Sequence, residues 1–478
     1  MDKAWLAAQS EKSYLKVAGW IQRVRDAVSG NRSPLLTWCL DYPSPDHAPR
    51  FTHSGRVVQG WVLLDPEKAD TLSRVRIICH LQPAFELCCP LELKRLDVIE
   101  RILQQPADGH EQLSCGFRFT VPPDLHSFNL SFELDGQRWP LQRIEVEPAV
   151  AENTLLKVIK GHNDWLFLDN DTNFSIDQFT GRLQLTTRGL KSWEAYVDAL
   201  KNGFGAQRSP AVMLVAPTKE SVMGHYHPMT AAAVSPLDPV FALFPPGLLL
   251  HPVSELRDTL GDEAFFKTDT HWTHRGGSLA AALVARKLGL SAEHLDRLLA
   301  SDRYRVRNHA GDLGSKLEPR MAAPASFLTS FHYGKWVVYD NGLPNFGRVI
   351  VIQYPDALEE GCCLVFGSSS SYSMFNYLSR FFRQLVFVHT AGNLDPSLID
   401  AVAPDYLIVQ TNARFMIRPP IADYNLKNTI IEKQDSLDCT AIERQAQIRK
   451  VSDLELVTSL GLEPWHVPVS AIDHEAAV

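Results

Sequence analysis

The chain has 478 residues, of which 45% are hydrophobic and 21% charged, and its formal net charge is −8. This length exceeds that of one ordinary domain, so two or three domains are expected. The composition is that of an ordinary globular protein, and the negative charge argues against a nucleic-acid-binding surface. None of the eight cysteines forms a C-x-x-C pair with a matching partner, which favours buried free thiols.

The first 53 residues are predicted to form a helix and a linker. Apolar residues recur near helical spacing up to about residue 28, as in a packing helix or a partner-binding or membrane-surface helix. Pro, Ser, Asp and Gly cluster in residues 29–53. No charged region followed by an apolar core begins the chain, and no apolar run approaches the ~20 residues that span a bilayer. These observations predict a soluble, cytoplasmic protein.

Residues 54–149 change to a period of two, which is typical of strands. The Asp135-Gly136 pair predicts a tight turn at the end of one alternating run. We expect a small antiparallel β-sandwich that acts as a binding or spacer module, because nothing in it looks catalytic. The predicted strands cover residues 57–63, 74–79, 115–121 and 128–134.

Residues 150–420 alternate between strand-like and helix-like patterns, after a hairpin predicted at 158–168. The run 211–216 is continuously apolar, as in a buried parallel strand. Such alternation predicts an α/β fold, with a parallel sheet flanked by helices. Residues 421–478 are less regular and are assigned to a C-terminal extension. Further strands are predicted at 363–366, 385–388 and 406–409, with helices at 373–383 and 395–402.

Two motifs within 150–420 together predict a nucleophilic site. Serine is a poor nucleophile unless a base takes its proton and a third group orients that base. Ser369 lies two residues after Gly367, where an apolar strand gives way to a helix, and open α/β sheets place their sites at such strand ends. His271 is the candidate base and Asp269 the group that orients it, because a spacing of two puts both side chains on one side of an extended segment.

The residues leave other interpretations open. Ser369 could cap a helix in a serine-rich turn, and Ser371 is a second candidate nucleophile because the run of serines makes the register ambiguous. We predict no metal and no cofactor. The alternative is a metal site built from Asp269, His271, His274 and His309 or Asp312.

The motifs also resemble a known superfamily. Gly367-Ser368-Ser369, Gly392 and Asn412 resemble the successive blocks of SGNH hydrolases, although that superfamily usually has Asp where this chain has Ser368. The resemblance implies that Ser369 is the nucleophile and that Gly392 and Asn412 complete an oxyanion hole with the serine N–H. It also implies an SGNH-type fold for residues 150–420.

A second resemblance narrows the first. The motif at 269–272, the hairpin near 158–167 and Lys219 resemble the SGNH hydrolase-like acetyltransferases of alginate O-acetylation, of the AlgJ and AlgX type. In that family an Asp-x-His pair serves the serine, which places Asp269 and His271 in the triad.

This resemblance implies a serine-dependent O-acetyltransferase that acts on a carbohydrate or polysaccharide through an acetyl-serine intermediate. A carbohydrate acetyl esterase and a non-catalytic glycan-binding or assembly protein are the alternatives. The implied partners are a glycan acceptor, an acetyl donor, and a glycan-assembly or membrane acetyl-donor protein, with no nucleic acid. The family is usually periplasmic, which stands as the alternative to a cytoplasmic location.

Overall fold

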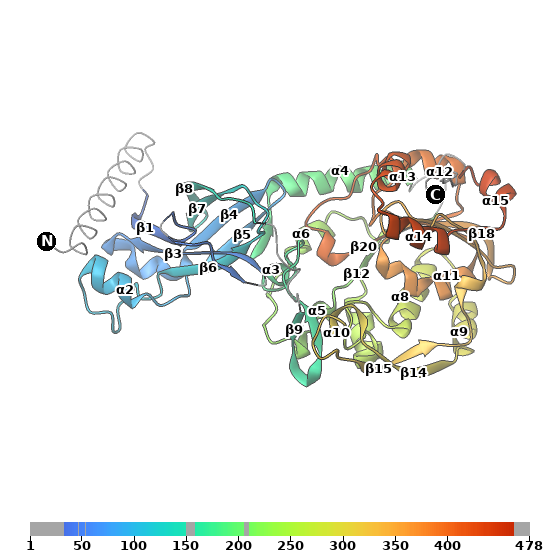
Figure 1. Cartoon of the computed structure of the whole chain (residues 1–478), viewed down its shortest axis with the longest axis horizontal. Helices are drawn as coiled ribbons and strands as arrows, with labels where there is room; N and C mark the ends of the chain where they lie inside the picture. Colours follow the sequence, from blue (N-terminus) through green and yellow to red (C-terminus); the bar gives the residue numbers. More distant parts are fainter. Residues whose placement is uncertain (1–32, 46, 53, 150–157, 205–209, 463–478) are drawn as a thin grey trace, which may run out of the picture. The chain divides into compact units, whose positions relative to one another are not determined.

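The computed structural model describes the chain outside residues 1–32, 46, 53, 150–157, 205–209 and 463–478 (Figure 1). The predicted N-terminal helix therefore lies outside the described residues. In the described part of the chain, no helix combines the length and the apolar character that a membrane span requires. The chain divides into two compact units: residues 1–157, 170–172 and 182–184 form the first, and residues 158–169, 173–181 and 185–478 form the second.

The first unit is strand-rich and holds two antiparallel sheets. In one sheet the central strand β3 (Gly55–Leu64) pairs with β1 (Leu35–Tyr42), β2 (Phe51–Thr52) and β6 (Gly116–Val121). The order of the other is β11 (Leu183–Leu185), β5 (Phe85–Pro90), β4 (Arg76–Gln82), β7 (Ser127–Leu134) and β8 (Gln137–Glu145). The described helices of this unit are η1 (Pro66–Arg74), α2 (Leu96–Val98) and the π-helix η2 (Ile99–Leu103).

Local patterns explain most of these strands. β7 buries every second residue, as its alternation predicts. The turn to β8 places Asp135 at φ 52° and Gly136 at φ 79°, the left-handed conformation that a two-residue hairpin turn needs. The predicted linker over 29–53 is wrong for residues 35–42, which form β1. Their side chains are apolar or β-branched in large part, and pairing with β3 satisfies their backbone groups.

The second unit is built on an eight-stranded sheet, which confirms the predicted α/β fold. Five neighbouring strands run parallel to one another: β13, β12, β20, β18 and β19. The sheet continues with β17, β16 and β21, each antiparallel to the strand before it. The order is β13 (Leu249–Leu250), β12 (Ala211–Ala216), β20 (Tyr406–Asn412), β18 (Glu359–Gly367), β19 (Phe382–His389), β17 (Val349–Gln353), β16 (Val337–Asp340) and β21 (Lys450–Val451).

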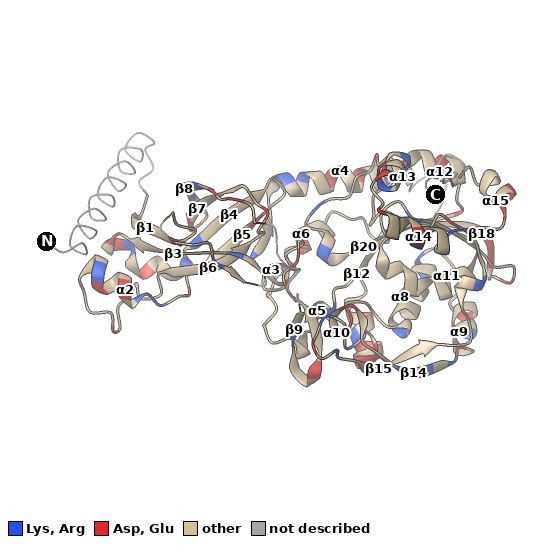
Figure 2. Ribbon diagram, in the orientation of Figure 1, with Lys and Arg blue, Asp and Glu red and all other residues tan. Residues whose placement is uncertain are grey.

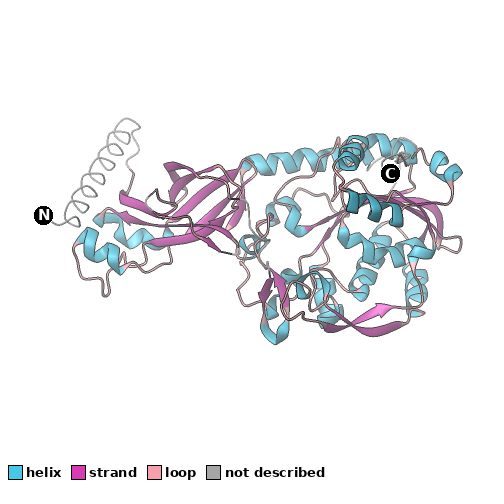
Figure 3. Cartoon of the chain, in the orientation of Figure 1, coloured by secondary structure: helices cyan, strands magenta, loops and turns pink. Residues whose placement is uncertain are grey.

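Both faces of this sheet are buried, which explains the continuous apolar runs of its strands. Along β12, Val212 and Leu214 belong to one core, whereas Met213 and Val215 belong to the other. The first core includes residues of α8 (His274–Lys287), α9 (Ala292–Ala300) and α11 (Phe375–Phe381). The second includes residues of α4 (Thr187–Phe204), α12 (Pro396–Val402), α13 (Leu426–Asp435) and α15 (Leu454–Ser459). Figure 3 shows these helices around the strands of the sheet.

Smaller elements complete the second unit. Two antiparallel pairs lie outside the main sheet: β9 (Val158–Lys160) with β10 (Leu166–Leu168), and β14 (Tyr304–His309) with β15 (Ala323–Leu328). The short helices include α3 (Ser175–Phe179), α5 (Lys219–Val222), α6 (Asp238–Phe241), α7 (Val253–Leu260) and α10 (Gly311–Gly314). Figure 2 shows acidic and basic residues interspersed along both units.

The described part of the predicted C-terminal extension belongs to the second unit. β21 joins the edge of the main sheet, where Val451 pairs with Tyr339. Leu426 and Val457 are fully buried in the second core. A separate extension over residues 421–462 is therefore the wrong description, because these residues cover one face of the sheet. α14 (Cys439–Ile448) lies between α13 and β21 in the chain.

The sheet brings several chain segments to one edge. β12, β18, β19 and β20 are parallel, so their carboxyl ends meet at the same side. In the register, Ala216 lies beside Asn412 and Gly367 beside His389. The segments that follow these strand ends are therefore neighbours, and in open α/β sheets such an edge holds the functional site.

Candidate active site

The serine run begins where β18 ends. Gly367 is the last residue of the strand, and the 3₁₀ helix η7 (Ser369–Met374) starts two residues later. A Cβ atom on residue 367 would overlap the Ser371 hydroxyl and the Phe387 ring, so this tight turn requires glycine. Ser369 is half-buried, while Ser368, Ser370 and Ser371 are buried. Of the four serines, Ser369 is therefore the most accessible.

Hydrogen bonds separate the roles of these serines. The Ser369 hydroxyl lies 3.0 Å from Nε2 of His271. The hydroxyls of Ser368 and Ser371 instead donate to Oε1 of Gln410, over 2.9 and 2.7 Å. Gln410 lies on the neighbouring strand β20 and is fully buried. The geometry therefore favours Ser369 over Ser371 as the nucleophile, and the other two hydroxyls anchor the turn.

His271 and Asp269 are joined as the sequence predicts. Oδ1 of Asp269 accepts hydrogen bonds from Nδ1 of His271 over 2.7 Å and from the His271 backbone N–H over 2.8 Å. This assigns the Nδ1 proton to the Asp269 side and leaves Nε2 to face Ser369. The three side chains thus form a continuous hydrogen-bonded chain from carboxylate to imidazole to hydroxyl, the arrangement that activates a serine.

The second oxygen of Asp269 is held by the loop that carries α10. Oδ2 accepts from the backbone N–H of Asp312 over 3.0 Å, and His309 Nε2 lies 3.2 Å away. Asp312 in turn accepts from the N–H and hydroxyl of Thr270. Gly311, at φ 62°, lies so close that any Cβ there would overlap the Asp269 carboxylate. Asp312 therefore helps to fix the segment that carries the base.

Trp272 connects the base segment to the serine turn. Its ring is 1% exposed, and its Nε1 donates to the Ser370 carbonyl over 3.1 Å and to the Ser373 hydroxyl over 2.6 Å. Its neighbour Thr273 caps helix α8 by accepting from the Gly276 N–H. Trp272 is thus a packing residue that joins the segment carrying His271 to the turn carrying Ser369.

Asp269 and His271 each shift the pKa of the other. Burial favours the neutral form of Asp269, but the hydrogen bonds and charge of His271 and the N–H of Asp312 outweigh it, so the pKa of Asp269 lies well below its usual range. Burial disfavours the charged form of His271, but the Asp269 carboxylate outweighs this effect and raises the pKa of His271 above its ordinary value of 6.5. Asp269 is therefore ionised at neutral pH and stabilises an imidazolium.

This raised pKa predicts the pH dependence of any reaction that uses His271 as base. His271 must be neutral at Nε2 to accept the Ser369 proton, so kcat/KM is expected to rise with pH through a pKa above 6.5 and then level off. The measurement is kcat/KM for an acetyl ester from roughly pH 5 to 9, with circular dichroism at each pH as a control for folding. Activity that increases on acidification would contradict the assignment.

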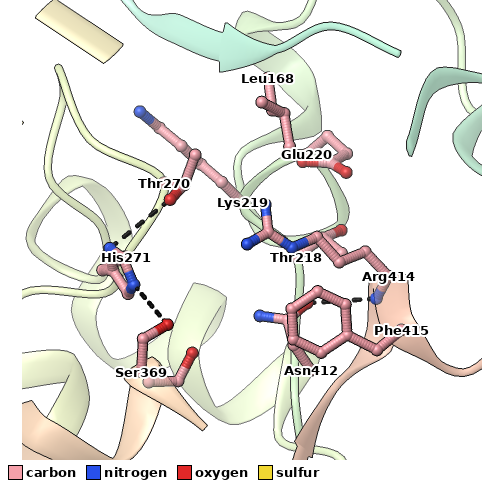
Figure 4. Close-up of a pocket in the computed structure, with 11 residues that line it drawn as sticks. Leu168, Thr218, Lys219, Glu220, Thr270, His271, Ser369, Asn412, Arg414 and Phe415 are labelled. Atoms are coloured by element: carbon pink, nitrogen blue, oxygen red, sulfur yellow. Dashed lines mark hydrogen bonds between the residues drawn. The ribbon is translucent and has the colours of Figure 1, made fainter. Parts of the chain in front are cut away.

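Ser369 and His271 open into one pocket, to which Asn412 also contributes (Figure 4). Oδ1 of Asn412 accepts from the Arg414 N–H over 3.1 Å, which fixes the orientation of the amide. Its amide nitrogen lies on the side that faces Ser369 in Figure 4. The described residues that line the pocket are Leu168, Thr218, Lys219, Glu220, Thr270, His271, Ser369, Ser370, Asn412, Arg414 and Phe415.

Gly392 is not among the described residues that line this pocket. After β19 the chain folds over the end of β18, where the N–H groups of Thr390 and Ala391 both donate to the Gly367 carbonyl. Gly392 then sits at φ 100° and its carbonyl accepts from the buried Tyr196 hydroxyl. The bond from Tyr196 involves the Gly392 carbonyl, whereas the predicted oxyanion donor is the Gly392 N–H, so this role stays a prediction.

Several residues around the Asp269–His271–Ser369 chain were not predicted as catalytic or oxyanion-hole residues. Arg414 and Glu220 line the pocket, and Nε of Arg414 is buried without a hydrogen-bond partner in the described structure. His309 was predicted only as an alternative metal ligand. Arg414 follows Asn412 by two positions, and Glu220 follows Lys219, so proximity to motif residues was the available signal.

The metal alternative fits this geometry less well. Ligand atoms of Asp269, His271 and Asp312 lie within 4.8 Å of one another. However, the His271 ring already bonds to Asp269 and Ser369, and Asp312 bonds to Thr270. A cation would have to displace those bonds. Burial lowers the pKa of His274 to about 4, and its ring packs on Phe327 instead of joining the group.

Comparisons with solved structures find similar chains at low identity. PatB1 of Bacillus cereus with a sulfonyl adduct is 11% identical, covers 55% of this chain and 97% of its own, and has a TM-score of 0.41. The O-acetyltransferase domain of Pseudomonas putida AlgJ is 16% identical, with coverages of 61% and 99% and a TM-score of 0.33. Pseudomonas aeruginosa AlgX is 14% identical, with coverages of 55% and 63% and a TM-score of 0.25. No curated protein matches the chain.

A family model matches a segment that lies largely in the second unit. It is described as the SGNH hydrolase-like domain of the acetyltransferase AlgX, and it matches residues 158–325. This range holds Asp269 and His271 and ends before the serine turn. The predicted resemblance is thereby confirmed: residues 158–325 match the SGNH hydrolase-like domain of the AlgX-type acetyltransferases.

Proposed function

We propose that the protein is a carbohydrate O-acetyltransferase that works through an acetyl-Ser369 intermediate. The observation that carries the proposal is the hydrogen-bonded chain from Asp269 through His271 to Ser369 at the carboxyl edge of the sheet. The match to an acetyltransferase domain model supports acetyl as the group transferred and a glycan hydroxyl as the acceptor.

The first half-reaction acetylates the enzyme. Nε2 of His271 takes the Ser369 proton as Oγ bonds to the carbonyl carbon of the acetyl donor. The tetrahedral intermediate collapses, the bond to the donor's leaving group breaks, and that group receives the proton from His271. Asp269 stays ionised throughout and stabilises the imidazolium, which agrees with its depressed pKa.

The second half-reaction transfers the acetyl group. A sugar hydroxyl attacks acetyl-Ser369 while His271 removes the hydroxyl proton. The second tetrahedral intermediate expels Ser369, which regains its proton from His271. Water in place of the sugar would make the protein an esterase, because the same residues serve both reactions.

Mass spectrometry of the intact protein tests the intermediate. Wild-type protein exposed to an acetyl ester is expected to gain the mass of one acetyl group on Ser369, and added glycan is expected to remove it with formation of acetylated glycan. Release of free acetate at a rate that no glycan changes would identify an esterase. Protein that never acquires the adduct, and never reacts with a serine-directed phosphonate, would exclude the mechanism.

Asn412 is proposed as an oxyanion donor, because its amide is fixed by Arg414 and its nitrogen faces Ser369. Asn412→Ala is expected to lower kcat by about 10²–10³-fold, the usual effect of losing one such donor. The binding of the ester should change little, since the donor acts on charge that develops in the transition state. Asn393→Ala, in the loop after β19, is the control; an equal loss there would point to misfolding instead.

A further inference from the structure

Lys219 is a buried charge that the proposed reaction does not use. It is the first residue of α5, just after β12, and is only 3% exposed. A buried ammonium is costly unless hydrogen bonds compensate for its lost hydration. Burial lowers the pKa of Lys219 to about 7, while the charges of Asp269, Asp312 and Glu220 oppose this shift and Lys267 adds to it.

The compensation comes from four backbone carbonyls. Nζ of Lys219 donates to the carbonyl oxygens of Leu166 and Phe266, both over 2.7 Å, and to those of Lys267 and Asp269 over 2.9 and 3.1 Å. The rings of Trp165 and Phe167 lie 4.9 and 5.3 Å from the ammonium. The three protons are thus shared among four oxygens, which hydrogen-bond the charged form and favour it.

These four carbonyls belong to two segments. Leu166 is in β10, and the other three residues fall within 266–269, a segment that ends two residues before His271. The Leu166 N–H also donates to the Lys267 carbonyl over 3.0 Å, so the ammonium reinforces a backbone contact between the two segments. Without the ammonium, each of the four carbonyls would lose this hydrogen bond, and their converging dipoles would repel one another.

We propose that Lys219 is a positioning residue that holds the 266–269 backbone, and through it the Asp269–His271 pair, within hydrogen-bonding distance of Ser369. The inference rests on the proposed function for its kinetic consequence. Its structural basis is separate: the ammonium contacts the backbone carbonyl of the residue whose carboxylate orients the base. A small displacement of that residue would lengthen the His271–Ser369 bond, and misplacement by about 1 Å costs on the order of 10² in rate.

The test compares Lys219→Met and Lys219→Gln with the control Lys267→Met. Lys267 lies in the same segment and is half-buried. Its backbone carbonyl accepts a hydrogen bond from Lys219, and Lys267→Met keeps that carbonyl. Titration with a serine-directed phosphonate counts the intact sites of each variant. We expect both Lys219 variants to keep titratable sites, to lose about 10–100-fold in kcat per titrated site, and to change KM for the acetyl ester less than about twofold. Wild-type kcat per site in both variants, with only a lower melting temperature, would overturn the proposal.

Two NMR measurements separate this proposal from the proposed function. The imidazole proton of His271 that bonds to Asp269 is expected at low field in the wild type and to be lost or shifted in Lys219→Gln, whether or not the protein transfers acetyl groups. If no variant folds, the wild type suffices: ¹⁵N-resolved hydrogen exchange should show the Lys219 amine protons protected from solvent, as its hydrogen bonds to four backbone carbonyls require. Amine protons that exchange freely, or an unshifted His271 proton in a folded variant, would refute the positioning role.

Discussion

Ser369→Ala is expected to lower acetyl transfer by about 10⁴–10⁶-fold, the range measured when a serine nucleophile is removed from such a triad. The Ser369 hydroxyl is the one that faces Nε2 of His271, so no neighbouring serine can replace it without moving the turn. The adduct seen by mass spectrometry should disappear in the same variant. Circular dichroism should stay unchanged, because the lost hydroxyl is half-buried and makes no contact that anchors the sheet.

Ser371→Ala is the matched control for this prediction. Ser371 lies two residues away in the same 3₁₀ helix, but its hydroxyl bonds to Gln410. Its removal leaves one fewer donor for a buried amide oxygen, which costs about 1 kcal/mol of stability. We expect most of the activity per folded molecule to remain. The reverse result, an active Ser369→Ala and an inactive Ser371→Ala, would assign the nucleophile to the other serine.

Asp269→Asn is expected to cost about 10⁴-fold in kcat, because an amide no longer enforces the tautomer that places a lone pair of His271 toward Ser369. Both carboxylate oxygens accept hydrogen bonds, so the new NH₂ group must face a donor on one side or the other. The Asp269 charge also raises the pKa of His271, so the pH profile of the residual activity should shift to lower pH.

The control for this substitution is Asp262→Asn. Asp262 lies outside the triad and accepts a hydrogen bond from the Tyr226 hydroxyl at the surface. We expect its kcat and its pH profile to match those of the wild type. If Asp269→Asn retained more than about a tenth of the wild-type rate at every pH, His271 would not depend on that carboxylate and the triad would be refuted.

The secondary structure was largely readable from local patterns. Alternation predicted β3, β4, β6 and β7, and the apolar run at 211–216 predicted β12. These patterns report which faces of an element are buried, and a strand buried on both faces in the second unit appears as an unbroken apolar run. β1 was not predicted because polar and turn residues surround it, and its pairing with β3 is not visible in the local pattern.

The candidate site was predicted in part. Asp269 and His271 could be predicted because they are close in the chain: a carboxylate and an imidazole two residues apart form a recognisable motif. The positions of Gly392 and Asn412 depend on loop geometry beyond the strand ends. Asn412, the last residue of β20, lines the pocket, and in the loop after β19 the Gly392 carbonyl accepts a hydrogen bond from Tyr196.

The sequence by itself determined the class of fold, the edge of the sheet where chemistry is expected, and the residue types of a nucleophile with its base. It left the register of the serine run open, because neighbouring serines are chemically equivalent until their partners are known. Tertiary structure decided that point: Gln410 from β20 takes the hydroxyls of Ser368 and Ser371, and His271 takes that of Ser369. It also revealed the bonds of Lys219, since an ammonium collects carbonyls from segments that only folding brings together.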